Sequence, residues 1–140
     1  MDVSWVVLDG LCEQHGESFF HLDTEAFRRN YEEFTQAFRA IYPRTTIGYS
    51  YKTNYVPRLG RMVQRMGGYA EVVSGMEYEL ARQIGVPGDR ILFNGPFKPA
   101  PELEAALLAG SVCNLDSSEE LDIVERLAAR EPQALSLIHI

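Results

Sequence analysis

The sequence predicts an α/β fold in which parallel strands alternate with helices, as in the N-terminal half of a TIM (β/α)8 barrel. Short runs rich in β-branched and aromatic residues recur about every 22 residues, and a segment with helical periodicity separates each pair. These runs begin near Ile47, Tyr69, Ile91, Val112 and Ala134. Because each helical crossover returns the chain to the same side of the sheet, the strands are expected to run parallel.

The helices between the predicted strands carry recognisable start and stop signals. Ser74-x-x-Glu77 and Ser117-x-x-Glu120 both match the capping box, in which a serine and a glutamate satisfy the first amides of a helix. Gly67, Gly85 and Gly110 stand where helices are expected to end. The pattern therefore assigns helices to the segments between the strand-like runs.

Residues 1–45 precede this regular pattern. A weak helix and loop is predicted over Met1–Gly16, a short strand over Ser18–Leu22, and a helix capped by Asp23 that runs to about Tyr42. The last helix carries an aromatic stripe, which we interpret as core, formed by Phe27, Tyr31, Phe34 and Phe38.

Two architectures fit alternating strands and helices, an open doubly wound sheet and a closed barrel. The regular unit length and the lack of a Gly-x-Gly-x-x-Gly turn after the first strand favour the barrel. A complete barrel needs about 200 residues or more, whereas these 140 residues supply about four strand-helix units and a fifth strand over residues 46–140. We therefore expect residues 1–140 to form a single partial barrel domain, an N-terminal fragment of something longer.

Composition and charge exclude several classes of function. A net charge of −7 argues against nucleic acid or an anionic membrane as a main partner. With neither a leader pattern nor a membrane-spanning apolar run, we expect a cytoplasmic protein. Cys12 and Cys113 are too far apart in sequence for a recognisable disulfide or metal motif, so we predict reduced, buried thiols. No metal site is predicted, because the histidines are scattered at His15, His21 and His139.

The candidate catalytic residue is Lys52, at the end of the first predicted strand. In a strand over Ile47–Lys52, the small residues Gly48 and Ser50 share one face with Lys52 and leave room around its amine. Active sites of parallel strand-helix folds lie at the carboxyl ends of strands. An amine partly sheltered there is competent to form an imine with an aldehyde. The alternative is an ordinary lysine that extends from the strand end into solvent.

Polar residues also stand at the ends of the next three predicted strands. Glu71 is a carboxylate that could pair with the lysine, whereas the helix cap alone accounts for Ser74. Asn94 begins a polar turn with Lys98 just beyond it, for which a loop role and a site role are equally favoured. The fourth strand ends with Asn114 and Asp116, the second of which suits a helix cap.

These segments resemble a known family. Residues 49–54, YSYKTN, are similar to the Tyr-Ala-x-Lys-Ala-Asn signature of the pyridoxal-phosphate-dependent decarboxylases with an alanine-racemase-type barrel, which include diaminopimelate, ornithine and arginine decarboxylases. The segments HGESFFHLDTEAF, EVVSGMEYELA, GVPGDRILFNGPFK and NLDSSEELDIV resemble family segments in the same order. The similarity covers nearly the whole chain and looks closest to diaminopimelate decarboxylase.

The resemblance implies a cofactor, pyridoxal 5'-phosphate, held by Lys52 as an internal aldimine. Glu71 stands where the family usually has aspartate, a carboxylate close to the lysine, and Ser74 matches a further family position. With Asn94, to which the resemblance gives no defined role, these residues are our candidates for cofactor binding. The implied activity is decarboxylation of a small-molecule amino acid of the diaminopimelate type, in lysine biosynthesis, by a homodimer.

Other parts of such an enzyme have no counterpart in these residues. In the family, the acid on the ring nitrogen, the phosphate loop and a stacking histidine come from later strands, and a cysteine-acid pair comes from a C-terminal β-domain, which we expect to be absent here. We therefore predict that the chain alone is inactive. The alternatives are an amino-acid racemase on the same barrel, a non-catalytic pyridoxal-phosphate-binding protein, and an open-sheet binding protein with an exposed Lys52.

Overall fold

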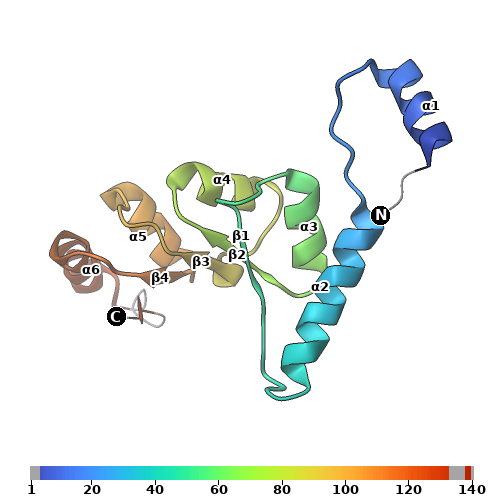
Figure 1. Ribbon diagram of the computed structural model, residues 1–140. Helices are drawn as coiled ribbons and strands as arrows, with labels where there is room; N and C mark the ends of the chain where they lie inside the picture. Colours follow the sequence, from blue (N-terminus) through green and yellow to red (C-terminus); the bar gives the residue numbers. More distant parts are fainter. Residues whose placement is uncertain (1–3, 133–137, 140) are drawn as a thin grey trace.

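The computed structural model describes residues 4–132 and 138–139 and confirms the predicted alternation of strands and helices (Figure 1). The helices are α1 (Trp5–His15), α2 (Thr24–Arg39), α3 (Pro57–Arg65), α4 (Gly75–Gln83), α5 (Ala100–Leu108) and α6 (Ser118–Arg130). The strands are β1 (Gly48–Ser50), β2 (Tyr69–Val72), β3 (Ile91–Phe93), β4 (Val112–Asn114) and β5 (Ile138–His139). A short 3-10 helix, η1 (Gly88–Arg90), precedes β3.

The strands form one parallel sheet in the order β1-β2-β3-β4-β5. Each strand therefore pairs with the strand that precedes it in the chain. A doubly wound sheet reverses its strand order at a switch point, and no reversal occurs among the described strands. The order is the one that a strand-helix barrel requires, so the barrel prediction is confirmed over the open-sheet alternative.

The core lies between the sheet and helices α4, α5 and α6. Alternate strand residues are almost inaccessible to solvent and face these helices, namely Ala70, Val72, Ile91, Phe93 and Cys113. The intervening residues of β2, β3 and β4 are only half-buried or exposed. We call the face that carries them the open face. The period-two burial pattern thus places Glu71 and Asn114, together with the apolar Leu92 and Val112, on the face opposite the helices.

The N-terminal region departs from the prediction in two ways. Helix α1 forms but buries none of its residues, and the strand predicted over Ser18–Leu22 is absent (Figure 1). A strand needs a neighbour for its backbone amides and carbonyls. The described strands pair only with one another, so residues 17–22 have no strand partner among them. Within residues 4–132 and 138–139, no helix is both long and apolar enough to cross a bilayer.

Helix α2 is capped as predicted, because the Asp23 carboxylate accepts the Ala26 amide at 2.8 Å. The core interpretation of its aromatic stripe is right for Phe27 and Tyr31, which are half-buried, and wrong for Phe34 and Phe38. Phe27 packs edge-on against Tyr49 of β1, with ring centroids 5.8 Å apart. Phe34 and Phe38 are about half exposed and pack on each other instead. Tyr31 is half-buried, and the one buried residue of α2 is Thr35, so the covered side of the helix is not the side that carries Phe34 and Phe38.

The tail of the chain is only partly described. Of the fifth strand predicted to begin near Ala134, residues 133–137 lie outside the described part. Ile138 and His139 pair with Cys113 and Asn114 of β4 in parallel register. The fifth strand is therefore confirmed for these two positions.

Tyr51 carries the one buried side-chain polar atom without a hydrogen-bond partner in the described part of the chain. Its ring is 2% exposed, and its hydroxyl lies so close to α3 that a Cβ on Gly60 would be 2.6 Å from it. Burial raises the pKa of this hydroxyl to about 12. An unsatisfied buried donor costs about 1–3 kcal/mol.

We therefore expect Tyr51→Phe to raise the free energy of unfolding by about 1–2 kcal/mol. The measurement is a urea titration followed by far-ultraviolet circular dichroism. Tyr49→Phe is the control, because Tyr49 as a residue is only half-buried, and it should change stability by less than about 0.5 kcal/mol. A loss of stability in Tyr51→Phe would mean that the hydroxyl has a hydrogen-bond partner in solution.

The two cysteines are both free but differ in exposure. Cys113 is fully buried as predicted, whereas Cys12 on α1 is half-buried, so the prediction is wrong for Cys12. Burial raises the pKa of Cys113 to about 12. Cys113 is therefore protonated, and unreactive as a nucleophile, at neutral pH in the folded chain.

At about pH 8 we expect a thiol reagent to modify Cys12 readily and Cys113 only after unfolding. The protonated Cys113 thiol contributes its full stability below the unfolded pKa of about 8.5, and this contribution is lost as pH rises toward 12. Peptide mapping with and without urea measures how far the thiol reagent labels each cysteine in the folded and unfolded chain. Equal labelling of both cysteines in the folded chain would contradict the burial of Cys113.

Candidate active site

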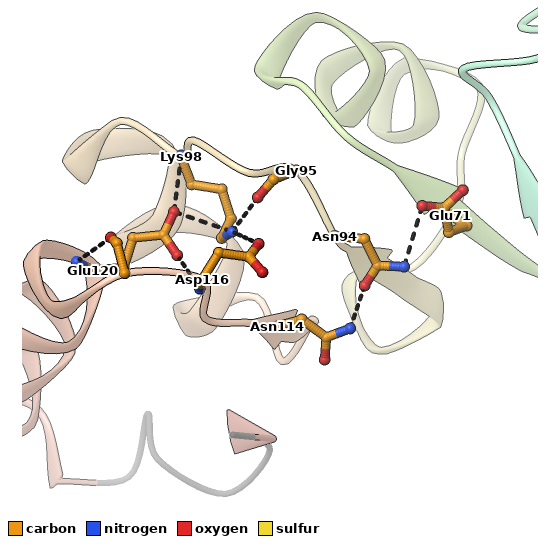
Figure 2. Close-up of polar contacts among 8 residues, drawn as sticks. Glu71, Asn94, Gly95, Lys98, Asn114, Asp116 and Glu120 are labelled. Atoms are coloured by element: carbon orange, nitrogen blue, oxygen red, sulfur yellow. Dashed lines mark hydrogen bonds and ion pairs between the residues drawn. The ribbon is translucent and has the colours of Figure 1, made fainter.

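Three side chains form a line of hydrogen bonds across the carboxyl ends of β2, β3 and β4 (Figure 2). Glu71 Oε1 accepts a hydrogen bond from Asn94 Nδ2 at 3.1 Å. Asn94 Oδ1 accepts one from Asn114 Nδ2 at 2.5 Å. We call Glu71, Asn94 and Asn114 the amide chain. The structure thus joins three polar residues that the sequence placed at the ends of neighbouring strands.

Strand alternation places the amide chain on the open face. Ala70 and Val72 on either side of Glu71 are buried under the helices, so Glu71 points the other way. Asn94 follows the buried Phe93 in the same manner, and Asn114 follows the buried Cys113. The line crosses three strands because residues at their carboxyl ends become neighbours once the parallel sheet forms.

A second polar cluster lies beyond the same strand ends and is centred on Lys98 (Figure 2). Lys98 is 1% exposed, and its ammonium donates to the Gly95 carbonyl. The side-chain nitrogen Nζ of Lys98 lies 3.0 Å from Glu120 Oε1 and 3.4 Å from Asp116 Oδ2. We call Gly95, Lys98, Asp116 and Glu120 the lysine clamp. It ties the loop after β3 to the loop after β4.

Glu120 has a larger role than the predicted capping box. The box itself is confirmed, since the Glu120 amide donates to Ser117 Oγ at 3.2 Å. The Glu120 carboxylate, only 3% exposed, also accepts the backbone amides of Lys98 at 3.0 Å and Asp116 at 2.9 Å. Sequence reasoning did not find this buried ion pair. The available signal was a lysine within a loop segment whose neighbours are otherwise proline, phenylalanine, glycine and alanine.

The matching box at α4 confirms the interpretation of Ser74 as a helix cap. Ser74 Oγ accepts the Glu77 amide at 3.3 Å, and Glu77 Oε2 accepts the Val73 amide at 2.8 Å. Glu77 is buried, so this pair holds the end of β2 against the start of α4. The Ser74 hydroxyl acts only as an acceptor there, which leaves its hydrogen available.

Lys52 lies in a turn directly after β1 rather than inside the strand. The strand predicted over Ile47–Lys52 ends at Ser50, and Thr53 closes the turn by donating its amide and its hydroxyl to the Ser50 carbonyl. Lys52 is exposed, so the prediction of a partly sheltered amine is wrong. The reason is that β1 is the edge strand of the described sheet, so no described strand covers the turn on its outer side.

Lys52 nevertheless follows the part of β1 that pairs with Glu71. The register pairs Ser50 with Glu71, and the Tyr51 amide donates to the Glu71 carbonyl at 2.9 Å. Within residues 4–132, neither the Lys52 amine nor Glu71 Oε2 makes a hydrogen bond or ion pair. The structure therefore has an exposed lysine in the turn after β1 and, on the next strand, a carboxylate with one oxygen unpaired among the described residues.

Comparison with known proteins decides the family. Residues 25–140 match the family described as pyridoxal-dependent decarboxylase, pyridoxal binding domain. The chain belongs to this family. Its resemblance to pyridoxal-phosphate-dependent decarboxylases, inferred above from the lysine motif and three later segments, is thereby confirmed.

Individual relatives of this pyridoxal-binding domain agree. The chain is 29% identical over 129 residues to diaminopimelate decarboxylase of Aquifex aeolicus, covering 91% of this chain and 30% of the relative. It is 29% identical over 132 residues to L-glutamyl-[BtrI acyl-carrier protein] decarboxylase of Niallia circulans, covering 94% of this chain and 30% of the relative. Both relatives are decarboxylases, but their names specify different substrates.

The solved structures show the same fold. The crystal structure of diaminopimelate decarboxylase from M. jannaschii in complex with L-lysine superposes with a TM-score of 0.78 at 29% identity, covering 86% of this chain and 29% of that one. The described strands and helices thus correspond to strand-helix units of the decarboxylase TIM barrel. The chain spans about 30% of the length of these relatives.

Proposed function

We propose that this chain is the pyridoxal-phosphate-binding part of an amino-acid decarboxylase of the diaminopimelate type, and that Lys52 binds the cofactor covalently. The observation that carries the proposal is the contrast between the only two lysines in the sequence. Lys98 is buried and held by the lysine clamp, whereas Lys52 is exposed and unengaged among the described residues. Lys52 is therefore the lysine that can reach an aldehyde.

The residues present fit the reactive end of this cofactor. Bound pyridoxal phosphate supplies an electron sink for the carbanion that is left when an α-amino acid loses its carboxylate. Lys52 supplies the nucleophilic amine, which must first lose a proton. Glu71 lies on the neighbouring strand, where its free oxygen Oε2 is available to pair with the Lys52 ammonium or to take up its proton. Both groups stand at carboxyl strand ends, where this fold class places its sites.

The other two candidate residues support Lys52 and Glu71. Asn94 donates to Glu71 Oε1 and so holds the glutamate, whose side chain is one methylene longer than the aspartate usual in the family. Ser74 caps α4, and its hydroxyl hydrogen is available to a ligand at the carboxyl end of β2. We assign both residues to cofactor binding through these positions.

The finer features of the whole enzyme also belong to this proposal. We propose a small amino-acid substrate, a role in lysine biosynthesis, a homodimer and a cytoplasmic location. We further propose a division into a first segment, residues 1–45, and a partial barrel, residues 46–140. Because the ring-nitrogen acid and phosphate loop of the family have no counterpart in these residues, the chain alone should release no carbon dioxide from diaminopimelate when pyridoxal phosphate is added.

The test of the proposal is covalent trapping. The chain is mixed with one equivalent of pyridoxal phosphate, reduced with borohydride and mapped by peptide mass spectrometry. We expect the label on Lys52, at a level above that on the α-amino group, and almost none on Lys98. In urea the preference for Lys52 should disappear and Lys98 should become labelled. If the label is distributed over the amines in the same way in the folded and unfolded chains, Lys52 is not part of a cofactor-binding site.

A further inference from the structure

The amide chain has only one consistent hydrogen-bond polarity. An ionised carboxylate only accepts hydrogen bonds, so Glu71 requires the NH2 group of Asn94 to face it. The Asn94 oxygen then faces β4, where it requires a donor in turn. Asn114 meets this requirement by presenting its own NH2 group. The orientation of the Asn94 amide is thus set by Asn114 on one side as well as by the Glu71 carboxylate on the other.

The backbone at Asn94 is held so firmly that only its side chain can respond. The Asn94 amide donates to the Val72 carbonyl at 2.8 Å. The following residue, Gly95, is buried, and its carbonyl accepts a hydrogen bond from the Lys98 ammonium. Gly95 is also packed so tightly that a Cβ there would overlap the Val73 carbonyl oxygen. A disturbance at Asn114 is therefore expected to turn the Asn94 amide rather than to move the loop.

We propose that Asn114 is a positioning residue for Glu71 that acts through the amide of Asn94. The proposal rests on the proposed function, in which Glu71 is the partner of the Lys52 amine. Asn114 itself is exposed and stands two strands away from Glu71, about 10 Å by the usual strand spacing. Its role is to keep the Asn94 NH2 group turned toward β2. Glu71 is then held at Oε1 and keeps Oε2 free for Lys52.

The substitution that tests this role is Asn114→Asp, which keeps the shape of the side chain. An ionised aspartate only accepts hydrogen bonds, so the Asn94 NH2 group should turn toward it. The Asn94 oxygen would then face the Glu71 carboxylate, and two acceptors cannot bond to each other. Glu71 loses its donor. Asn114→Ala has no such requirement, so Asn94 can continue to donate to Glu71.

The first experiment needs no cofactor. The side-chain NH2 resonances of Asn94 are assigned in a nitrogen-proton correlation spectrum of the chain, with Asn94→Ala as the assignment control. Glu71→Gln should shift these resonances strongly in the wild-type and Asn114→Ala backgrounds. In the Asn114→Asp background the shift should be lost. An equal response in all three backgrounds would overturn the proposal.

The second experiment measures the rate at which pyridoxal phosphate is trapped on Lys52. Asn114→Asp should slow trapping about tenfold, the usual scale for losing a hydrogen bond to a charged group. A direct effect of the added charge is separated by a double-mutant cycle. In the Asn94→Ala background Asn114→Asp should have no further effect, and an unchanged tenfold effect there would overturn the proposal. If wild-type Lys52 takes no label, the proposed function fails, and the resonance experiment still decides the role of Asn114.

Discussion

Lys98→Met is expected to lower the free energy of unfolding by about 3–5 kcal/mol, a large share of the stability of a small domain. Methionine fills a similar volume but leaves the Glu120 carboxylate, 3% exposed, without its cation. It also removes the donor to the Gly95 carbonyl. A buried charge that loses its partner is costly because neither water nor a counter-ion compensates it. Urea unfolding followed by circular dichroism measures the change.

Two further variants separate the charge effect from loss of packing. Arg29→Met removes an exposed cation from α2 and should cost less than about 0.5 kcal/mol. Glu120→Gln combined with Lys98→Met should be more stable than Lys98→Met alone, since no buried carboxylate then lacks a partner. If Lys98→Met is as stable as Arg29→Met, the lysine clamp makes no net contribution to stability.

Lys52→Arg is expected to abolish the trapping of pyridoxal phosphate on the barrel and leave only the label on the α-amino group. The substitution keeps the positive charge and most of the side-chain length. A guanidinium is protonated at all accessible pH values, however, and is not a nucleophile toward an aldehyde. Peptide mapping after borohydride reduction measures the loss. The folded state should be unaffected, because Lys52 makes no hydrogen bond or ion pair within residues 4–132.

Exposure alone would also favour Lys52 over the buried Lys98, so the control introduces a second exposed lysine. Arg29→Lys places an amine at an exposed position of α2, outside the strands of the sheet and the turns that follow them. In this variant Lys52 should still carry several times more label than the new lysine. Equal labelling of the two would reduce Lys52 to an ordinary surface lysine, the alternative considered from the sequence.

Several features of the site were predictable because they depend on local chemistry. The strand-helix rhythm, the Asp23 cap and both Ser-x-x-Glu boxes follow from residues a few positions apart. The placement of Glu71 and Asn94 at one edge of the sheet followed from one further step, that parallel strands end at the same edge, but the hydrogen bond between them was not predicted. These parts required no knowledge of which distant side chains meet.

The errors have a common cause. The strand over Ser18–Leu22 and the burial of Phe34 and Phe38 each need a partner surface, and their own residues do not specify one. The exposure of Lys52 likewise reflects the edge position of β1. Sequence periodicity identifies a side chain that is suited to burial, but burial itself requires something to pack against.

By itself the sequence determined the alternating parallel architecture, the helix caps and the family, because these rest on short-range patterns and on motifs in a recognisable order. Only the tertiary structure decided that Lys98 is buried and Lys52 exposed, since the carboxylate partners of Lys98 lie 18 and 22 residues further along the chain. It also joined Glu71, Asn94 and Asn114 into one line. Such contacts exist only after the strands have paired, and the strength of a buried charge or amide depends on them.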